Sequence, residues 1–313
     1  MSQQRVEISP ELTAVSLTYT NKTFIAEEIL PKVPVGTRSF EYYEYDKNNY
    51  FHLPETRIGE KGKANKVEFR GKKKSASVED HALEEDIPVS KIKEAQNSQR
   101  HINYETKAVN QLTRLLKTRK EITVSNILSN VNSYGGNSGN VKTLTNAEKI
   151  NNDTANAVKI IQTAADSLLY KPNILVTSRL GLSALRMNPF IVDACGAASK
   201  KAGIVSIEAV KDLFGFEKIL AGESVINTAN KGQAANMHPC WANNIALLHI
   251  DKDADADEGV TFGFEAVYED IQIGKYHNSE LGTQGCDVVK AFYSSVYLNI
   301  CADCGFLLKD ILA

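Results

Sequence analysis

The run DKDADADEG at residues 251–259 places an aspartate at every second position, a spacing that resembles the oxygen ligands of a calcium-binding loop. A twelve-residue calcium loop needs a glycine at its sixth position and a glutamate at its twelfth. A loop that starts at Asp251 has Ala256 and Phe262 there, and a start two residues later fails in the same way. We therefore interpret the run as a solvated acidic turn, with a weak cation site as the alternative.

No other motif completes a catalytic or metal-binding set. Cys301 and Cys304 form a CxxC, but one pair cannot supply the four ligands of a structural zinc ion. A redox CxxC is expected after the first strand of a thioredoxin-like unit, whereas this one lies near the C-terminus. Ser183 in GLSAL lacks the second glycine of a nucleophile elbow, and GEKGK at 59–63 fails the spacing of a phosphate loop. We expect no enzyme, cofactor or metal centre, and two cysteines in the core.

The composition narrows the possible partners. The chain has 313 residues, with 36 Lys and Arg against 38 Asp and Glu, so its formal net charge is −2. This balance excludes a global attraction for nucleic acid, and any such binding needs a local patch. The N-terminus lacks a signal region, no apolar run approaches the ~18 residues of a membrane span, and the odd number of cysteines argues against a disulfide framework. We expect a cytoplasmic, reduced protein.

The elements that surround these motifs begin with an extended region. Residues 37–86 predict a long two-stranded ribbon with a polar tip. Phe40 and Tyr42 share one strand face, while Tyr43 and Tyr45 share the other. A half-buried strand normally carries aromatic residues on one face only, so both faces of this ribbon need cover, from the body of the chain or from another copy.

Charge is segregated along the same region. Basic residues come first and acidic ones follow: Arg57, Lys61, Lys63, Lys66, Arg70, Lys72, Lys73 and Lys74, then Glu79, Asp80, Glu84, Glu85 and Asp86. Three interpretations are open: a solvated ribbon tip, a nucleic-acid patch, or a basic tip that meets an acidic surface on a neighbouring copy. The third would make a heterologous contact, which closes rings or extends lattices.

The rest of the chain alternates helices and strands. Apolar spacing predicts a long helix over about 100–132, which YGGNSGN at 134–140 ends. Residues 145–250 predict a compact α/β unit with helices at 153–169, 179–187 and 206–214 and strands in NILVTS, EKILA, ESVIN and NIALLHI. In VTFGFEAVY, residues Val260, Phe262, Phe264, Ala266 and Tyr268 alternate onto one strand face, and the C-terminal tail is strand-like.

This order of parts resembles the major capsid proteins of tailed bacteriophages. Three segments carry the likeness: KPNILVTSRLGLSALRMNPFIVDA (171–194), VSIEAVKDLFGFEKILAGESVINTANKGQ (205–233) and HPCWANNIALLHI (238–250), which holds the single tryptophan, Trp241. The resemblance implies an α+β chain with the Hong Kong 97-like capsid fold, which encapsulin shells also use. Its parts would be an N-terminal arm (1–36), an extended β-ribbon loop (37–88), a spine helix with the first part of a peripheral domain (89–144), an axial domain (145–255) and the rest of the peripheral domain (256–313).

The function implied is structural. Such a chain would assemble through pentamers and hexamers into an icosahedral virion shell around double-stranded DNA, inside the host bacterial cytoplasm. Expected partners are other copies of the chain, a separate scaffolding protein, a portal, decoration proteins, and packaged DNA bound without sequence specificity; no membrane is expected. An encapsulin-like compartment and a nucleic-acid-binding protein that uses residues 57–74 are the alternatives.

Two features differ from some members of that family. The ribbon begins near residue 37, without the scaffolding domain that precedes it in some relatives, so scaffolding is expected from a separate protein. Some relatives join subunits through a Lys–Asn isopeptide bond, and Lys61, Lys63 and Lys66 lie on the corresponding loop. Because no partner asparagine or catalytic acid is identifiable, we expect a non-covalent shell. The candidate contacts between copies are Phe40, Tyr42, Tyr43, Tyr45, Arg57, Lys61, Lys63, Lys66, Arg70, Asp80, Glu84, Glu85 and Asp86.

Overall fold

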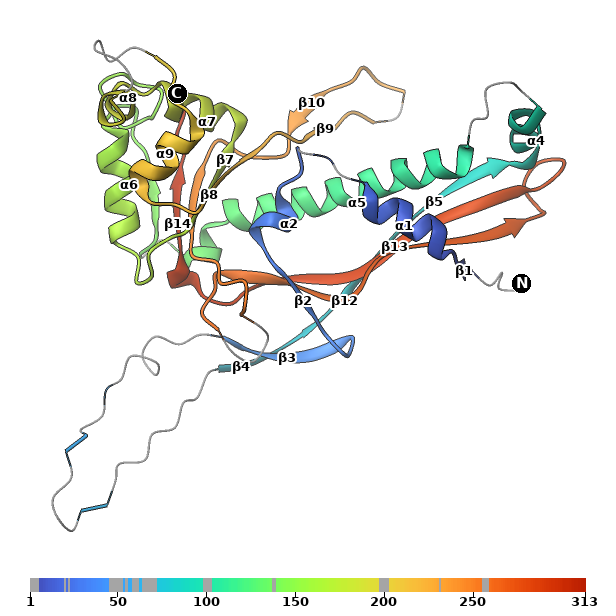
Figure 1. Cartoon of the computed structure of the whole chain (residues 1–313), viewed down its shortest axis with the longest axis horizontal. Helices are drawn as coiled ribbons and strands as arrows, with labels where there is room; N and C mark the ends of the chain where they lie inside the picture. Colours follow the sequence, from blue (N-terminus) through green and yellow to red (C-terminus); the bar gives the residue numbers. More distant parts are fainter. Residues whose placement is uncertain are drawn as a thin grey trace.

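Two β-sheets are organised around one long helix (Figure 1). The computed structural model describes residues 6–19, 21, 23–44, 53, 56–57, 62–63, 72–97, 103–136, 139–196, 203–230, 232–254 and 259–313. The first sheet runs alongside the helix, and the second, with four short helices, lies at one end of it. No helix in these ranges is long and apolar enough to cross a membrane.

The long helix, α5 (Tyr104–Ser129), has 26 residues and is therefore about 39 Å long. Asn103 caps it, because its side-chain oxygen accepts a hydrogen bond from the backbone N–H of Thr106 at 3.0 Å. A short 3-10 helix, η1 (Val131–Tyr134), follows and ends at Gly135, whose φ of 80° favours glycine. The prediction of a helix over about 100–132 is confirmed within this range, although residues 98–102 lie outside the described part.

The first sheet has the strand order β1, β12, β13, β5, with β2 parallel to β12. Its strands are β1 (Glu7–Ile8), β2 (Lys32–Pro34), β5 (Glu79–Pro88), β12 (Gly263–Asn278) and β13 (Cys286–Asn299). Val109, Leu112 and Leu116 of α5 pack against Ile273 and Val289 of the sheet. The N-terminal helix α1 (Pro10–Thr18) packs beside them, with Leu12 and Val15 at the edge of the same cluster.

The central strands of the second sheet are buried on both faces. It has the order β6 (Val141–Thr143), β14 (Gly305–Lys309), β11 (Ile245–Leu248), β7 (Ile174–Ser178), β8 (Lys218–Gly222). Leu175 faces one hydrophobic cluster, whereas Ile174 and Val176 face another, so both faces of β7 are covered. The helices α6 (Ala157–Asp166), α7 (Arg179–Met187), α8 (Pro189–Ala194) and α9 (Ile207–Phe214) belong to this unit. Helices and strands of the predicted types occur between 145 and 250, but the sheet also takes β6 and β14 from outside that range, and α8 was not predicted.

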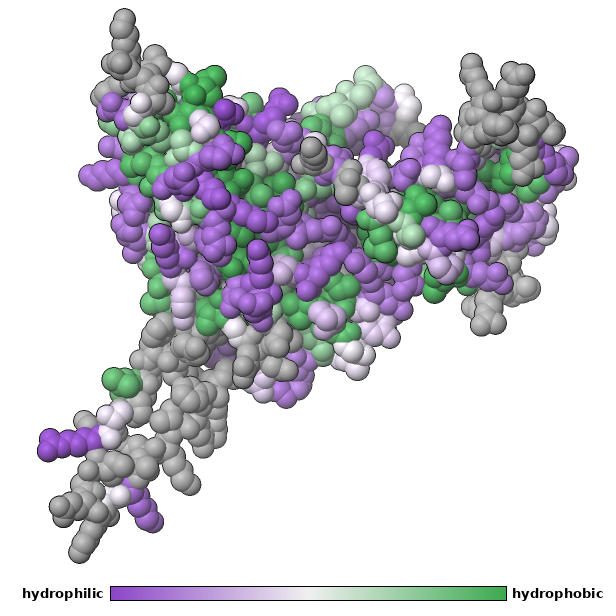
Figure 2. Space-filling view, viewed as in Figure 1, coloured by the Kyte–Doolittle hydropathy of each residue, from purple (hydrophilic) through white to green (hydrophobic). Residues whose placement is uncertain are grey.

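Two hairpins and three short elements complete the described part. The hairpins are β3 (Ser39–Glu44) with β4 (Lys72–Ser77), and β9 (Val225–Asn227) with β10 (Met237–Pro239). The short elements are α2 (Ala26–Ile29), α4 (Val89–Asn97) and η2 (Ala302–Cys304). On the face shown in Figure 2, hydrophobic residues form separate patches among hydrophilic ones, not one continuous apolar surface.

Three details differ from the sequence-based expectations. The ribbon does not continue to residue 86, because after Val78 the chain pairs along β13 and becomes the edge strand β5. The acidic residues 79–86 therefore lie on the first sheet and not on the ribbon. Tyr268 does not share the buried face of Phe264 and Ala266, because β12 shifts register between Val267 and Glu269. The C-terminal tail divides: β13 lies in the first sheet and β14 in the second.

The Cys301–Cys304 pair and the start of the Asp-rich run lie in ordinary surroundings. Cys301 and Cys304 are buried in the hydrophobic cluster that holds Trp241 and Phe262. The amide of Asp253 donates to the carboxylate of Asp251 at 3.0 Å, as in a local turn. Residues 255–258, which include the other two aspartates of the run, lie outside the described part. No cluster of three metal-ligating side chains occurs among the residues that the structure describes.

Candidate assembly interface

The ribbon of β3 and β4 is covered on one face by its own chain. Tyr42 is 9% exposed and packs with Val33, Phe264 and Ile300, and Phe40 packs against the same cluster. Tyr43, on the opposite face, is 40% exposed. The body thus supplies the cover for Phe40 and Tyr42, while the face of Tyr43 stays open to another surface. Tyr45 lies outside the described residues.

Part of the ribbon charge is already paired across its two strands. The ammonium of Lys74 donates to Glu44 at 2.8 Å, and Lys73 pairs with Glu41. These side chains are exposed, so their pairs contribute little to folding. Of the predicted basic contacts, Arg57 and Lys63 are exposed, and Lys61, Lys66 and Arg70 lie outside the described residues.

The acidic residues of β5 fall into two groups. Asp80 pairs with Arg38 and accepts a hydrogen bond from the Ser294 hydroxyl, and these two contacts lower the pKa of its carboxyl. Glu84 is bound by Lys290 at 2.9 Å and by the hydroxyl of Tyr276 at 3.1 Å. These two acids are therefore engaged by groups of their own chain.

Glu85 and Asp86 form the second group. Neither has a hydrogen-bond or ion-pair partner among the described side chains, and Asp86 is exposed at the free edge of the sheet. Acidic residues at an open edge also discourage unspecific strand pairing. Together with Glu79, an exposed acid whose contact is His81 at 3.9 Å, they are the acids of β5 that remain available to a basic surface on another copy.

A buried carboxylate on α5 connects three parts of the chain. Glu121 accepts hydrogen bonds from the backbone N–H groups of Ile25 and Ala26, at 2.7 and 2.6 Å, and so caps the short helix α2. Its second oxygen accepts from the indole N–H of Trp241 at 2.7 Å and from the hydroxyl of Ser224 at 3.3 Å. Burial raises the pKa of Glu121, and the four donors act in the opposite direction.

The neighbouring residue of the helix forms a second buried centre. Lys120 is 1% exposed, and its ammonium donates to the fully buried Glu265 at 2.7 Å. The hydroxyl of Ser295 also donates to Glu265 at 2.7 Å, and the ring of Tyr293 lies 4.7 Å from the ammonium. Burial and the negative charge of Glu265 raise the pKa of the Tyr297 hydroxyl. These contacts connect α5 to β12 and β13.

Sequence reasoning missed both centres. Lys120 and Glu121 occupy helix positions that the apolar spacing leaves polar, which is the pattern of a solvated face. Glu265 did give a signal, because it is a charged residue between Phe264 and Ala266 in an otherwise buried strand. A buried carboxylate there requires a cation, and a lysine on the packed helix supplies it.

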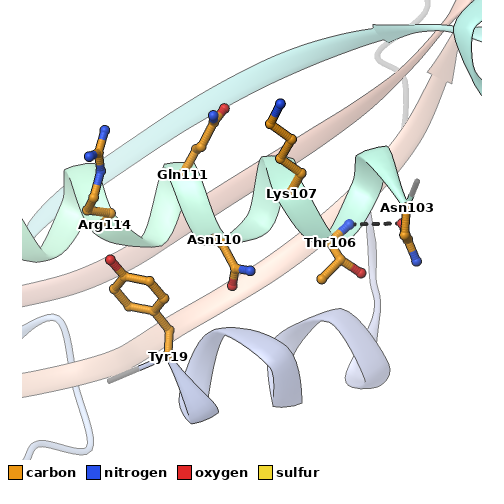
Figure 3. A pocket seen from close by; sticks show the side chains of 7 residues that line it. All are labelled: Tyr19, Asn103, Thr106, Lys107, Asn110, Gln111 and Arg114. Carbon is orange, nitrogen blue, oxygen red and sulfur yellow. Dashed lines mark hydrogen bonds between the residues drawn. The ribbon is translucent and has the colours of Figure 1, made fainter. Parts of the chain in front are cut away.

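A shallow polar groove of about 470 Å³ lies along the N-terminal half of α5, beside the end of α1 (Figure 3). Lys107, Gln111 and Arg114 project to one side of the helix, while Asn110 points toward the side of Tyr19. The lining contains two cations, three amides, a phenol and a hydroxyl: Tyr19, Asn103, Thr106, Lys107, Asn110, Gln111 and Arg114.

The comparison with known proteins decides the family. No protein-family model matches the chain. A major capsid protein from Pseudomonas phage JBD67 is 33% identical over 313 residues, which cover 100% of this chain and 100% of the relative. This chain belongs to the family of phage major capsid proteins. A second capsid protein, from Burkholderia phage BcepMu, is 26% identical over 255 residues, covering 80% of this chain and 78% of the relative.

Solved structures agree with this family in fold. A phage-related protein from Bordetella bronchiseptica RB50 superposes with a TM-score of 0.73 at 19% identity, over 98% of this chain and 99% of that one. The capsid of Myoviridae phage XM1 matches with a TM-score of 0.52 at 12% identity, over 93% and 92% of the two chains. The predicted Hong Kong 97-like α+β capsid fold is confirmed.

An encapsulin has the same fold. The holo-SrpI encapsulin complex from Synechococcus elongatus matches this capsid protein with a TM-score of 0.52 at 9% identity, over 94% and 93% of the chains. The fold alone therefore does not separate a phage shell from an encapsulin. The sequence relatives separate them, since both are phage capsid proteins.

Proposed function

We propose that the chain assembles through pentamers and hexamers into an icosahedral shell that encloses double-stranded DNA. The observation that carries this proposal is the full-length match to a phage major capsid protein. The chain serves as a structural protein and not as an enzyme. It assembles in the host bacterial cytoplasm with a separate scaffolding protein and a portal, and becomes part of the virion.

The contacts between copies involve the open side of the ribbon and the free edge of β5. The support is that Tyr43 is exposed, that Arg57 and Lys63 are exposed cations of the loop, and that Asp86 is an exposed acid next to Glu85 on β5. Opposite charges on two regions of the same chain suit a heterologous contact between identical copies. Asp80 and Glu84 contribute less to it, because their intrachain partners compete.

Electron microscopy of the expressed full chain, with and without its scaffolding protein, tests the shell. We expect closed particles of uniform size. A small, stable monomer under every assembly condition would contradict the proposal. Particles that contain enzymes and no DNA would indicate the encapsulin-like alternative.

Charge reversal tests the proposed contacts. We expect the pair Glu85→Lys and Asp86→Lys to slow assembly, measured by light scattering, and to leave unfolding unchanged. The matched control reverses Glu217 and Glu223, two exposed acids of the second unit. Equal assembly rates for the two double variants would place the contact elsewhere.

The shell is held together without covalent bonds. We expect this because no partner asparagine or catalytic acid for the loop lysines is identifiable in the sequence. Boiled particles should run as a single monomer band on a denaturing gel, and a ladder of multimers would overturn this expectation.

The nucleic-acid-binding alternative has less support. Lys73 and Lys74 pair with Glu41 and Glu44 of the neighbouring strand, so these two cations of the basic segment are partly neutralised within the ribbon. That alternative predicts tight, strongly salt-dependent DNA binding that disappears when the basic residues of 57–74 are neutralised.

A further inference from the structure

The polar groove on α5 carries two positive charges that are not paired with acidic groups in the described part of the chain. Lys107 and Arg114 line it, and no carboxylate does. Neither side chain has a hydrogen-bond or ion-pair partner in the part of the chain that the structure describes. The two acids of α5 are engaged elsewhere, since Glu105 pairs with Lys275 and Glu121 holds α2 and Trp241.

The groove and the edge strand β5 carry opposite charges. The edge strand β5 carries Glu79, Glu85 and Asp86, whereas the groove presents only cations and neutral polar groups. A chain with a net charge of −2 thus has one helix face that attracts anions. In a closed shell, the cationic groove can face the lumen while the acidic edge strand meets the outside or a neighbouring copy.

The arrangement of the groove fits a regular polyanion. Lys107, Gln111 and Arg114 follow one another on one side of the helix (Figure 3). The step from Lys107 to Arg114 corresponds to about 10.5 Å along the helix axis. DNA carries one phosphate per about 3.4 Å of axis on each strand, so both cations can meet phosphates in many registers. Amides and phenols, which also line the groove, are common partners of phosphate oxygens.

We propose that this groove faces the lumen and contacts the phosphate backbone of the packaged double-stranded DNA. The proposal rests on the proposed shell function and adds to it which side of α5 is inside and which side chains touch the genome. Two cations per copy give sparse contacts without sequence preference. Each contact is weak, but many copies line the wall, so the wall holds the outer layer of DNA while individual contacts exchange.

A protein partner would need different chemistry. The centres of protein interfaces are enriched in aromatic residues and depleted of charge, whereas this groove has one phenol, two cations and several amides. An acidic scaffold or a neighbouring copy in the groove would be revealed by the experiments below.

The first experiment assembles the full chain in the presence of a mixed-sequence DNA duplex, removes external DNA with nuclease and measures the DNA retained per particle. We expect the variant Lys107→Gln with Arg114→Gln to retain severalfold less DNA at moderate salt, and to form shells of normal size. The matched control, Lys159→Gln with Lys171→Gln, removes the same charge from two exposed lysines of the second unit and should retain DNA like the wild type.

A binding titration of unassembled full-length protein with the same duplex gives the number of phosphates neutralised. The slope of log K against log salt concentration should fall by about 0.9 for each phosphate that is no longer neutralised, hence by nearly 2 in the double variant. Unchanged retention and an unchanged slope, with normal shells, would overturn the lumen contact and leave the shell function intact. Failed assembly with an unchanged slope would identify the groove as a protein interface and also overturn it.

The orientation has an independent test. The exposed Gln111 is replaced by cysteine, and intact particles are treated with a large polymer-linked maleimide, with the wild type as the background for the native cysteines. We expect labelling only after the shells are dissociated. Equal labelling of intact and dissociated particles would show that the groove faces outward, which would refute the proposal whatever the DNA measurements give.

Discussion

Lysine–carboxylate pairs occur both under α5 and on the ribbon, but their surroundings differ completely. Lys120 and Glu265 are 1% and 0% exposed, whereas Lys74 and Glu44 are 50% and 33% exposed. In the buried pair, each charge has given up its water and depends on the other. In the ribbon pair, water can replace either partner. The body therefore fixes one conformation, while the ribbon keeps charges that another copy can engage.

The largest effect is expected when one partner of the buried pair is removed. Lys120→Met removes the cation that pairs with the fully buried Glu265, which should lower the free energy of unfolding by about 3–5 kcal/mol. Chemical denaturation of the unassembled chain measures it. The double variant Lys120→Met with Glu265→Leu should recover much of the loss. A double variant less stable than the single one would mean that the pair does more than neutralise its own charges.

Tyr42 and Tyr43 test the same contrast between adjacent residues. Tyr42→Ala removes a buried ring from the cluster around Phe264 and should cost about 3 kcal/mol of unfolding free energy. Tyr43→Ala removes an exposed ring and should change stability by no more than about 0.5 kcal/mol. Light scattering should show that Tyr43→Ala still slows assembly. Equal stability losses in the two variants would mean that the ribbon is covered on both faces within one chain.

Glu121→Gln tests the contacts by which α5 holds α2 and Trp241. Glutamine keeps one acceptor oxygen for the backbone N–H groups of Ile25 and Ala26, but the NH2 group that replaces the second oxygen cannot accept the hydrogen bond from the Trp241 indole. One unsatisfied buried donor costs about 1–3 kcal/mol. Because Trp241 is the single tryptophan, its emission spectrum reports this contact directly. An unchanged spectrum would show that the indole does not depend on the carboxylate.

The stability difference between the wild type and Glu121→Gln should depend on pH, with a sign that follows from the pKa of Glu121. Burial raises the pKa of Glu121 in the folded chain above its unfolded value, so the folded state binds this proton more tightly. The contribution of Glu121 is therefore greatest below the unfolded pKa and is lost as pH rises through the folded pKa. The stability difference between wild type and Glu121→Gln should accordingly shrink as pH rises through that range. A difference that grows with pH would show that the four donors outweigh burial.

The sequence predicted the elements that local patterns determine and missed the contacts between segments that lie far apart in the chain. Apolar spacing identified α5, α7, α9 and the buried strand β7, because local periodicity reflects which side of an element is covered. It placed residues 79–86 on the ribbon, since pairing with β13 is a contact between segments that lie far apart in the chain. Glu121 was missed for the same reason: its four donors lie far away in the chain, at residues 25–26, 224 and 241, and nothing near it in the sequence marks a buried acid.

The smallest effect on folding is expected for the ribbon pair itself. Lys74→Gln should change the free energy of unfolding by less than about 1 kcal/mol, because both side chains stay solvated when the pair is broken. If the loop charges meet an acidic surface of another copy, the same substitution should slow assembly at low salt, and the difference from wild type should vanish as added salt screens the contact. The Lys159→Gln variant, which neutralises an exposed lysine on α6, serves as the matched control. A stability loss for Lys74→Gln similar to that for Lys120→Met would remove the distinction between the two regions, because the ribbon would then depend on its own chain no less than the buried centre under α5 does.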